Sequence, residues 1–332
     1  MSVTMADIAK TCKVSLSTVS RALKNDPRLS EETRKRVQEV ADQLHYVPRQ
    51  QHQAPGRGRS YTIALIVTDI SNPFFPEIVH GIEDQAFSYD CSITLWNTRE
   101  DLHREKQYLY TLKKSKVAGV IMAASRLSEE QILNLVRTPT PCVLINRNIE
   151  DVPGVCGDYE LGAYQATKYL MNLGHSRIAL INGPASAQTS VWRERGFKRA
   201  LEERGLPLEP AFLSYNPPVI EGGYAATLRL LSLPEPPTAL FAYNDLVALG
   251  AMKAVREKGL KIPEHISIIG YDDIFISAYL DPPLTTVAQP KYMMGKLAMD
   301  MLWQLINGRK LYNHFVRLKP ELVVRSSCGV LV

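Results

Sequence analysis

Residues 4–23 read TMADIAKTCKVSLSTVSRAL and predict two short helices joined by a tight turn. Thr4 and Ser15 each carry a hydroxyl that can accept from the free amides of a first helical turn, so each predicts a helix start. Apolar positions suit a core shared by two crossing helices: Ala6, Ile8, Ala9, Val14, Val19, Ala22 and Leu23. The second helix keeps a small polar and cationic face that fits a DNA major groove, made of Leu16, Ser17, Thr18, Ser20 and Arg21. The stretch predicts a DNA-binding helix-turn-helix, with an ordinary helical hairpin as the alternative.

The next helix-like stretch, residues 30–46, reads SEETRKRVQEVADQLHY and is capped by Ser30. Its apolar stripe consists of Val37, Val40, Ala41 and Leu44. With VSLSTVSRAL before it and Pro48 after it, this segment resembles the three-helix headpiece of the LacI/GalR family of bacterial transcription regulators. The resemblance implies a small all-α headpiece at residues 1–47. In the turn between the first two helices, where that family usually has Gly, this chain has Cys12 and Lys13. A left-handed backbone conformation at Lys13 would cost about 1 kcal/mol of strain.

The charge of the chain is concentrated in the headpiece and the segment after it. Residues 1–60 hold 11 Lys and Arg against 6 Asp and Glu, whereas residues 61–332 hold 28 of each. A local surplus of cations is what phosphate contacts and counterion release require, although a merely solvated face is the alternative. We expect double-stranded operator DNA as a partner. Base contacts are assigned to Leu16, Ser17 and Arg21, and phosphate contacts to Thr4, Thr18, Asn25 and Thr33.

Residues 48–60 form a linker-like segment, rich in Gln, Gly and Arg and without apolar periodicity. In the family this segment forms a hinge helix on DNA, and a leucine from it enters the minor groove. Here Pro55 stands at that leucine's position and Gly56 follows, and both disfavour a helix. Either Pro55 is itself a minor-groove wedge, or the segment is a flexible tether whose Arg57 and Arg59 contact phosphates. We favour the tether.

From residue 61 onward, short β-rich apolar runs alternate with helical stretches, which predicts an α/β domain of parallel sheets with helices on both faces. The seven runs are YTIALIVT, CSITLWN, AGVIMA, PCVLIN, RIALIN, TALFAY and ISIIGYD, and we expect a closing strand at residues 322–324. They divide into two Rossmann-like lobes near Asp158. The resemblance implies a bilobed effector domain like the periplasmic sugar-binding proteins. Chain crossings near Asp158, Ala288 and Leu318 would assign residues 61–158 and 289–318 to lobe 1, and residues 159–288 and 319–332 to lobe 2.

Candidate ligand residues follow the strands, because the strand ends of such a fold face the cleft. Lobe 1 supplies Asp69, Phe74, Asn97, Asn146 and Arg147, which offer carboxylate, aromatic, amide and guanidinium groups. Lobe 2 supplies Trp192, Arg193, Asn244 and Asp272, and Gln289 follows where the chain returns to lobe 1. The resemblance places the family's effector-binding arginine at Arg193 and a hydroxyl-binding carboxylate at Asp272. Asp245 is assigned to helix capping. We expect a sugar or sugar derivative as the effector, with a purine or sugar phosphate as the second choice.

The combined prediction is a transcription regulator, of the repressor type, whose DNA affinity is controlled by a small effector. A homodimer is expected because one headpiece reads half a site, and the resemblance places its face on residues 74–87 and 248–255. A cytoplasmic sugar receptor without DNA binding is the alternative. No GxSxG, P-loop or GxGxxG motif indicates an enzyme, and no metal or cofactor is expected.

Two features of the sequence predict the cellular compartment of the protein. No apolar run approaches the ~20 residues that span a bilayer, and nothing at the N-terminus suggests export, so we expect a cytoplasmic protein without a membrane partner. The five cysteines are scattered and odd in number, which predicts reduced thiols without metal-ligand spacing: Cys12, Cys91, Cys142, Cys156 and Cys328.

Overall fold

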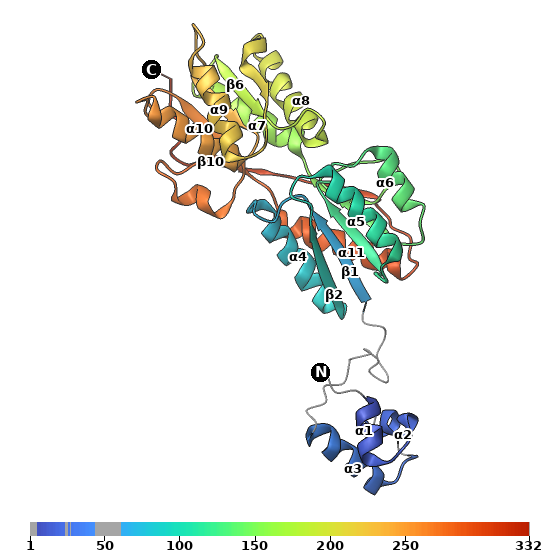
Figure 1. Cartoon of the computed structure of the whole chain (residues 1–332). Coiled ribbons are helices and arrows are strands. Elements are labelled where there is room, and N and C mark those ends of the chain that lie inside the picture. Colours follow the sequence, from blue (N-terminus) through green and yellow to red (C-terminus); the bar gives the residue numbers. More distant parts are fainter. Residues whose placement is uncertain (1–4, 24–25, 27, 44–60, 332) are drawn as a thin grey trace. The chain divides into compact units, whose positions relative to one another are not determined.

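The computed structural model describes residues 5–23, 26, 28–43 and 61–331 (Figure 1). Two compact units divide the chain, Met1–Arg59 and Ser60–Val332. Five residues to which we assigned DNA contacts lie outside the described part: Thr4, Asn25, Pro55, Arg57 and Arg59.

The first unit contains three helices, α1 (Met5–Cys12), α2 (Leu16–Leu23) and α3 (Glu31–Gln43). Ser15 Oγ accepts from the Thr18 amide at 3.1 Å and Ser30 Oγ accepts from the Thr33 amide at 3.3 Å, so the predicted caps at Ser15 and Ser30 are confirmed, whereas Thr4 lies outside the described residues. Lys13 has φ of 53°, which is the left-handed turn that the sequence implied. One buried core joins the three helices: Ile8, Ala9, Cys12, Val19, Ala22, Val37 and Ala41.

The second unit contains two six-stranded sheets, one in each lobe. The sheet of lobe 1 is parallel throughout, in the order β11-β5-β4-β3-β1-β2. Its strands are β1 (Tyr61–Val67), β2 (Cys91–Asn97), β3 (Gly119–Ala123), β4 (Cys142–Ile145), β5 (Gly154–Gly157) and β11 (Phe315–Leu318). Helices α4 (Phe74–Ser88) and α11 (Lys291–Ile306) share a core with one face, and α5 (Leu102–Lys114) and α6 (Glu129–Val136) with the other.

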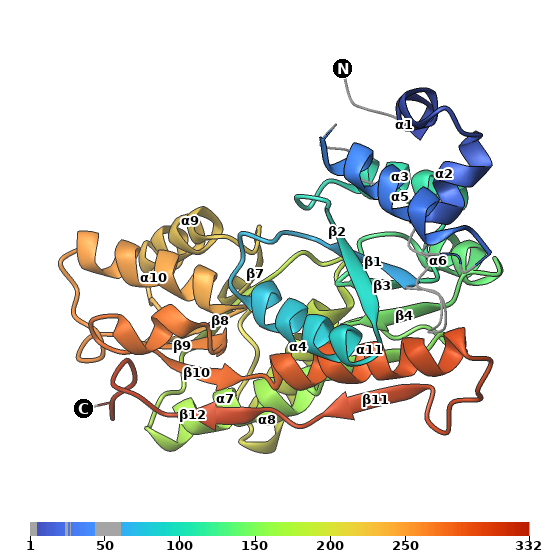
Figure 2. The same ribbon diagram turned by 90° about the horizontal axis from the view of Figure 1, so that it is seen from below.

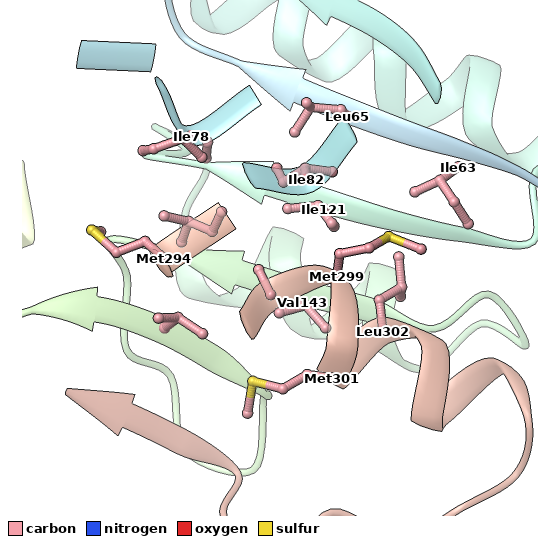
Figure 3. Packing of buried hydrophobic residues seen from close by; sticks show 14 of the residues in the cluster. Ile63, Leu65, Ile78, Ile82, Ile121, Val143, Met294, Met299, Met301 and Leu302 are labelled. Atoms are coloured by element: carbon pink, nitrogen blue, oxygen red, sulfur yellow. The ribbon is translucent and has the colours of Figure 1, made fainter. Parts of the chain in front are cut away.

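The main hydrophobic core of lobe 1 lies where α4 and α11 pack against the sheet. Figure 3 shows aliphatic and methionine side chains from both helices meeting those of β1, β3 and β4. The two helices run side by side (Figure 2). Gly81 on α4 and Gly295 on α11 lie where the helices touch, since a Cβ built on either would lie 2.1 Å from a backbone oxygen of the other helix.

Lobe 2 has the sheet order β12-β10-β9-β8-β6-β7, and only β12 runs antiparallel to its neighbour. The strands are β6 (Ile178–Asn182), β7 (Leu213–Tyr215), β8 (Ala239–Ala242), β9 (Ser267–Asp272), β10 (Thr285–Ala288) and β12 (Glu321–Val323). Helices α9 (Ile220–Leu231) and α10 (Asp245–Glu257) cover one face, and α7 (Tyr159–Asn172) and α8 (Gln188–Glu203) the other.

The strand prediction was incomplete. All seven predicted runs are strands and β12 matches the expected closing strand, but β5, β7, β10 and β11 were missed. Each of these four is only three or four residues long, and β5 reads GVCG, so none carries enough periodicity to stand out. Across the described ranges, no helix is long and apolar enough to cross a membrane.

Candidate functional site

The headpiece presents an exposed face on α2. Leu16 is 52% exposed, and Ser17 and Arg21 are also exposed, while Val19 and Ala22 on the opposite side are buried. A helix of eight residues with three neighbouring exposed side chains can reach base edges in a major groove. Of the phosphate candidates in the described part, Thr18 and Thr33 lie at the first turns of α2 and α3, where their hydroxyls contact the capping serines.

Replacing Arg21 with alanine should weaken DNA binding by about 1 to 3 kcal/mol and relax the preference at one base position. The reason is that a bidentate guanidinium contact reads a guanine edge. Fluorescence anisotropy against a library of single-base operator variants measures both effects. Lys35→Ala, an exposed cation on α3, is the matched control: it should weaken all sequences equally if it does anything. If Arg21→Ala leaves the operator affinity and the base preference unchanged, α2 is not the helix that contacts the bases.

A pocket that is partly open to solvent lies between the two lobes. Strand ends supply much of its lining, because Thr68 follows β1, Ala124 follows β3, Asn146 follows β4 and Asp272 ends β9. Three of these four have positive φ: Ala124 (58°), Asn146 (61°) and Asp272 (109°). Backbone strain of this kind persists only where the surroundings fix it, and it is concentrated at binding sites.

Arg193 and Asp272 form the buried centre of this pocket. The Arg193 guanidinium carbon lies 4.5, 4.1 and 4.2 Å from the ring centres of Tyr159, Tyr243 and Tyr271. One of its terminal nitrogens lies 3.8 Å from Asp272 Oδ1, and both side chains are over 90% buried. Three aromatic faces and a carboxylate therefore surround the cation and take the place of its water shell.

Protonation of Asp272 is finely balanced. Burial raises the pKa of its carboxyl to about 7, although Arg193 opposes that rise. Gln289 Nε2 donates to Asp272 Oδ1 at 2.7 Å, and Lys291 donates to the Asp272 backbone oxygen. The carboxyl group is thus oriented by the chain segment that crosses from lobe 2 to lobe 1.

The contribution of Asp272 to folding stability should therefore fall as pH rises from about 4 to 7. The folded state holds a proton on Asp272 up to about pH 7, whereas the unfolded state loses it near 3.8, so each pH unit in that window costs up to about 1.4 kcal/mol. Asp245, whose pKa burial raises to about 6, acts in the same direction. Urea unfolding at pH 5, 6, 7 and 8 should show the stability of the wild type declining relative to Asp272→Asn. A constant difference between the two proteins would contradict the buried, proton-binding carboxyl.

Six of the ten predicted ligand residues line the pocket: Phe74, Asn146, Arg147, Arg193, Asn244 and Asp272. Phe75, which was not among the candidates, lines the pocket as well. The two rings meet edge to face at 5.2 Å, and both belong to the core of lobe 1 while bordering the pocket.

The other four predicted ligand residues do not line the pocket. Asp69 accepts from the amide and hydroxyl of Ser71, and Asn97 Oδ1 accepts from the Ile70 amide at 3.4 Å, so both fix turns. Trp192 stacks on Tyr159 at 6.0 Å, and Gln289 holds Asp272. Of these four side chains, Trp192 and Gln289 contact residues that line the pocket.

The assignment of Asn244 and Asp245 was also wrong in one respect. Asn244 caps α10, since its Oδ1 accepts from the Val247 amide at 2.9 Å, although it lines the pocket too. Asp245 is fully buried and accepts from the Ile274 amide, Ser277 Oγ and Thr286 Oγ1 at 2.6 to 2.8 Å. Its carboxylate therefore joins three separate segments of lobe 2.

Several pocket residues were missed by the sequence analysis. Arg126 donates to both oxygens of Glu100, at 2.8 and 3.2 Å. Tyr159 and Tyr243 enclose Arg193. Gln188 exchanges two hydrogen bonds with the Asn148 backbone, at 2.7 and 3.0 Å, and so joins the rims of the two lobes. No local pattern marks these residues, because each acts through a partner that is distant in sequence.

Comparison with known proteins identifies both units. Residues 4–49 match the family described as bacterial regulatory proteins, lacI family, and residues 167–328 match the periplasmic binding protein-like domain. The HTH-type transcriptional repressor CytR of Escherichia coli (strain K12) is 36% identical over 330 residues, covering 99% of this chain and 97% of that protein. The chain belongs to the lacI family. The predicted family, fold class and role as a DNA-binding transcription regulator are confirmed.

Solved structures of lacI-family regulators also resemble this chain over its whole length. One is the lac repressor dimer bound to operator and the anti-inducer ONPF, which is 27% identical with a TM-score of 0.81. The match covers 100% of this chain and 100% of that chain. The complex of the transcriptional regulator CelR with cellobiose is 28% identical with a TM-score of 0.75, and covers 98% of this chain and 99% of that one. The match of residues 4–49 also excludes the alternative of a receptor without a DNA-binding domain.

Proposed function

We propose that a hydroxyl-rich small molecule, a carbohydrate or carbohydrate derivative, binds between the lobes and controls the affinity of this regulator for operator DNA. The regulator acts as a repressor, as CytR does. The observation that carries the proposal is the buried Arg193–Asp272 pair at the centre of an interlobe pocket.

The chemistry of the lining suits such a ligand. Asp272 can accept from two neighbouring hydroxyls, and the guanidinium of Arg193 can donate to ring or hydroxyl oxygens. Within the described part, Thr68 Oγ1, Asn146 Oδ1 and Arg193 Nε are buried without a hydrogen-bond partner. Because unpaired buried polar atoms cost about 1 to 3 kcal/mol each, a ligand that pairs them gains that energy on binding. Phe74 supplies an aromatic surface for the apolar face of a sugar ring.

Control of DNA binding follows from the position of the pocket. Its two walls belong to different lobes, and three chain crossings together with the Asn148–Gln188 bonds connect them. A ligand that contacts both walls stabilises one arrangement of the lobes over the other, and its differential affinity sets the size of the response.

We further propose a homodimer, which two operator half-sites require. The lac repressor relative is a dimer on its operator. In this chain α4, one of the two expected interface helices, leaves Phe87 86% exposed near its C-terminus, which is a suitable contact for a second copy.

The test uses the full-length protein. A thermal-shift screen of neutral sugars, nucleosides and sugar phosphates should find compounds that raise the unfolding temperature. Those compounds should change the affinity for operator DNA in a fluorescence anisotropy titration, and sedimentation should give a dimer. If stabilising compounds leave DNA affinity unchanged, the proposed control is wrong.

A further inference from the structure

Arg147 is the one arginine of the pocket lining that has no carboxylate within 4.0 Å in the described part of the chain. The other two are paired, Arg126 with Glu100 and Arg193 with Asp272. Arg147 follows β4 and donates one N–H to the Ser125 backbone oxygen at 3.0 Å. A guanidinium has five N–H donors in a planar fork, so most of its donor capacity remains for a ligand.

The surroundings of Arg147 leave its charge poorly compensated. It is only partly exposed, and burial lowers the pKa of its guanidinium although Glu105 and Glu129 act in the opposite direction. Arg126 is nearby and repels it. Glu105 is 1% exposed, and burial raises the pKa of its carboxyl, which weakens it as a counter-charge. A ligand that covers Arg147 must therefore replace water around an unmatched cation.

The two walls of the pocket thus differ in chemistry. Asp272, on the lobe 2 wall, accepts hydroxyls, and Asn146 Oδ1 next to Arg147 is a second buried acceptor without a partner in the described residues. On the lobe 1 wall, Arg147 offers parallel N–H groups, which match the two oxygens of a carboxylate or phosphate. A molecule that pairs with both walls carries hydroxyls and one anionic group.

We infer that the ligand of this regulator is an acidic carbohydrate, whose carboxylate or phosphate binds Arg147 while its hydroxyls bind Asp272 and Asn146. This rests on the proposed function and deepens it. A neutral sugar in the same pocket would leave Arg147 covered and without a counter-charge, whereas charge-assisted hydrogen bonds to the guanidinium are worth about 1.5 to 3 kcal/mol. Arg147 then determines which ligands are accepted, and the two acids are distinguished by experiment.

The experiment compares matched ligands on the full-length protein by titration calorimetry at constant ionic strength. The probes are glucose, glucuronate and glucose 6-phosphate; galactose and galacturonate; and ribose and ribose 5-phosphate. At least one acidic probe should bind about 10- to 100-fold more tightly than its neutral counterpart. A preference for the uronates identifies a carboxylate as the anionic group, and a preference for the phosphates identifies a phosphate.

Variants then assign the preference to Arg147. Arg147→Gln should bring the ratio of acidic to neutral affinity to within about threefold of one, while Arg147→Lys should retain part of the acidic advantage because the charge remains but the planar fork is lost. Arg199→Gln is the matched control, because that arginine lies on α8 in an ion pair with Glu160 outside the pocket lining, and it should change neither affinity.

The outcomes separate the two proposals. If a neutral sugar binds as tightly as its acidic counterparts and shifts operator affinity, the proposed function stands and the inference is overturned. Acidic preference that survives Arg147→Gln also overturns it. If no probe binds, neither the inference nor the choice of a carbohydrate ligand stands.

Discussion

Arg193→Leu should abolish the response of DNA binding to ligand, by weakening the ligand about 100-fold or more, or about 3 kcal/mol. The substitution removes the cation that three tyrosine rings enclose, and it leaves Asp272 buried without its opposing charge. The carboxyl of Asp272 should then hold its proton to higher pH, because the opposing effect of Arg193 on its pKa is gone. Calorimetry and operator anisotropy with and without ligand measure the loss.

The same helix provides the control for this prediction. Arg195 is exposed on α8, two residues after Arg193, so Arg195→Leu makes the same chemical change outside the pocket and should leave ligand affinity unchanged. Operator affinity without ligand should be kept in both variants, because the headpiece is a separate compact unit. Equal ligand affinity in Arg193→Leu and the wild type would mean that the pocket centre lies elsewhere.

A double-mutant cycle extends the test to the partner. Once Arg193 is leucine, the further change Asp272→Asn should cost less ligand affinity than it costs in the wild type, since the two side chains act together. Additive losses would show that the carboxylate and the guanidinium bind the ligand independently.

The sequence predicted the general plan of the site because that plan follows from topology. Parallel strands direct their carboxyl ends to one edge, so Asn146, Arg147 and Asp272 could be placed from strand patterns, and the resemblance added the role of Asp272. Arg193 has no strand to mark it, and it was found through the resemblance. The structure adds that it lies within the buried stripe of α8.

Other features depended on contacts that no local pattern contains. Asn and Asp are about equally good caps, so the sequence could not say which of Asn244 and Asp245 would cap α10. The choice is decided by Gly270 and Thr286: the glycine leaves room beside Asp245 Oδ1, and the threonine donates to it. Likewise, Tyr159 reads as an ordinary first residue of a helix until β9 brings Tyr271 beside it.

Gly295→Ala should destabilise lobe 1 by about 1 to 3 kcal/mol, even though alanine is the better helix former by about 1 kcal/mol. A Cβ at this position would lie 2.1 Å from the Ile78 backbone oxygen and 3.0 Å from the Ile82 amide nitrogen, so α4 and α11 must separate rather than move a side chain. Their shared core would then loosen (Figure 3). Urea unfolding measures the change. Met293→Ala, at a 42% exposed position two residues earlier on α11, is the control and should stay within about 0.5 kcal/mol of the wild type. If Gly295→Ala proves as stable as the wild type, the two backbones do not meet as closely as the helix packing requires.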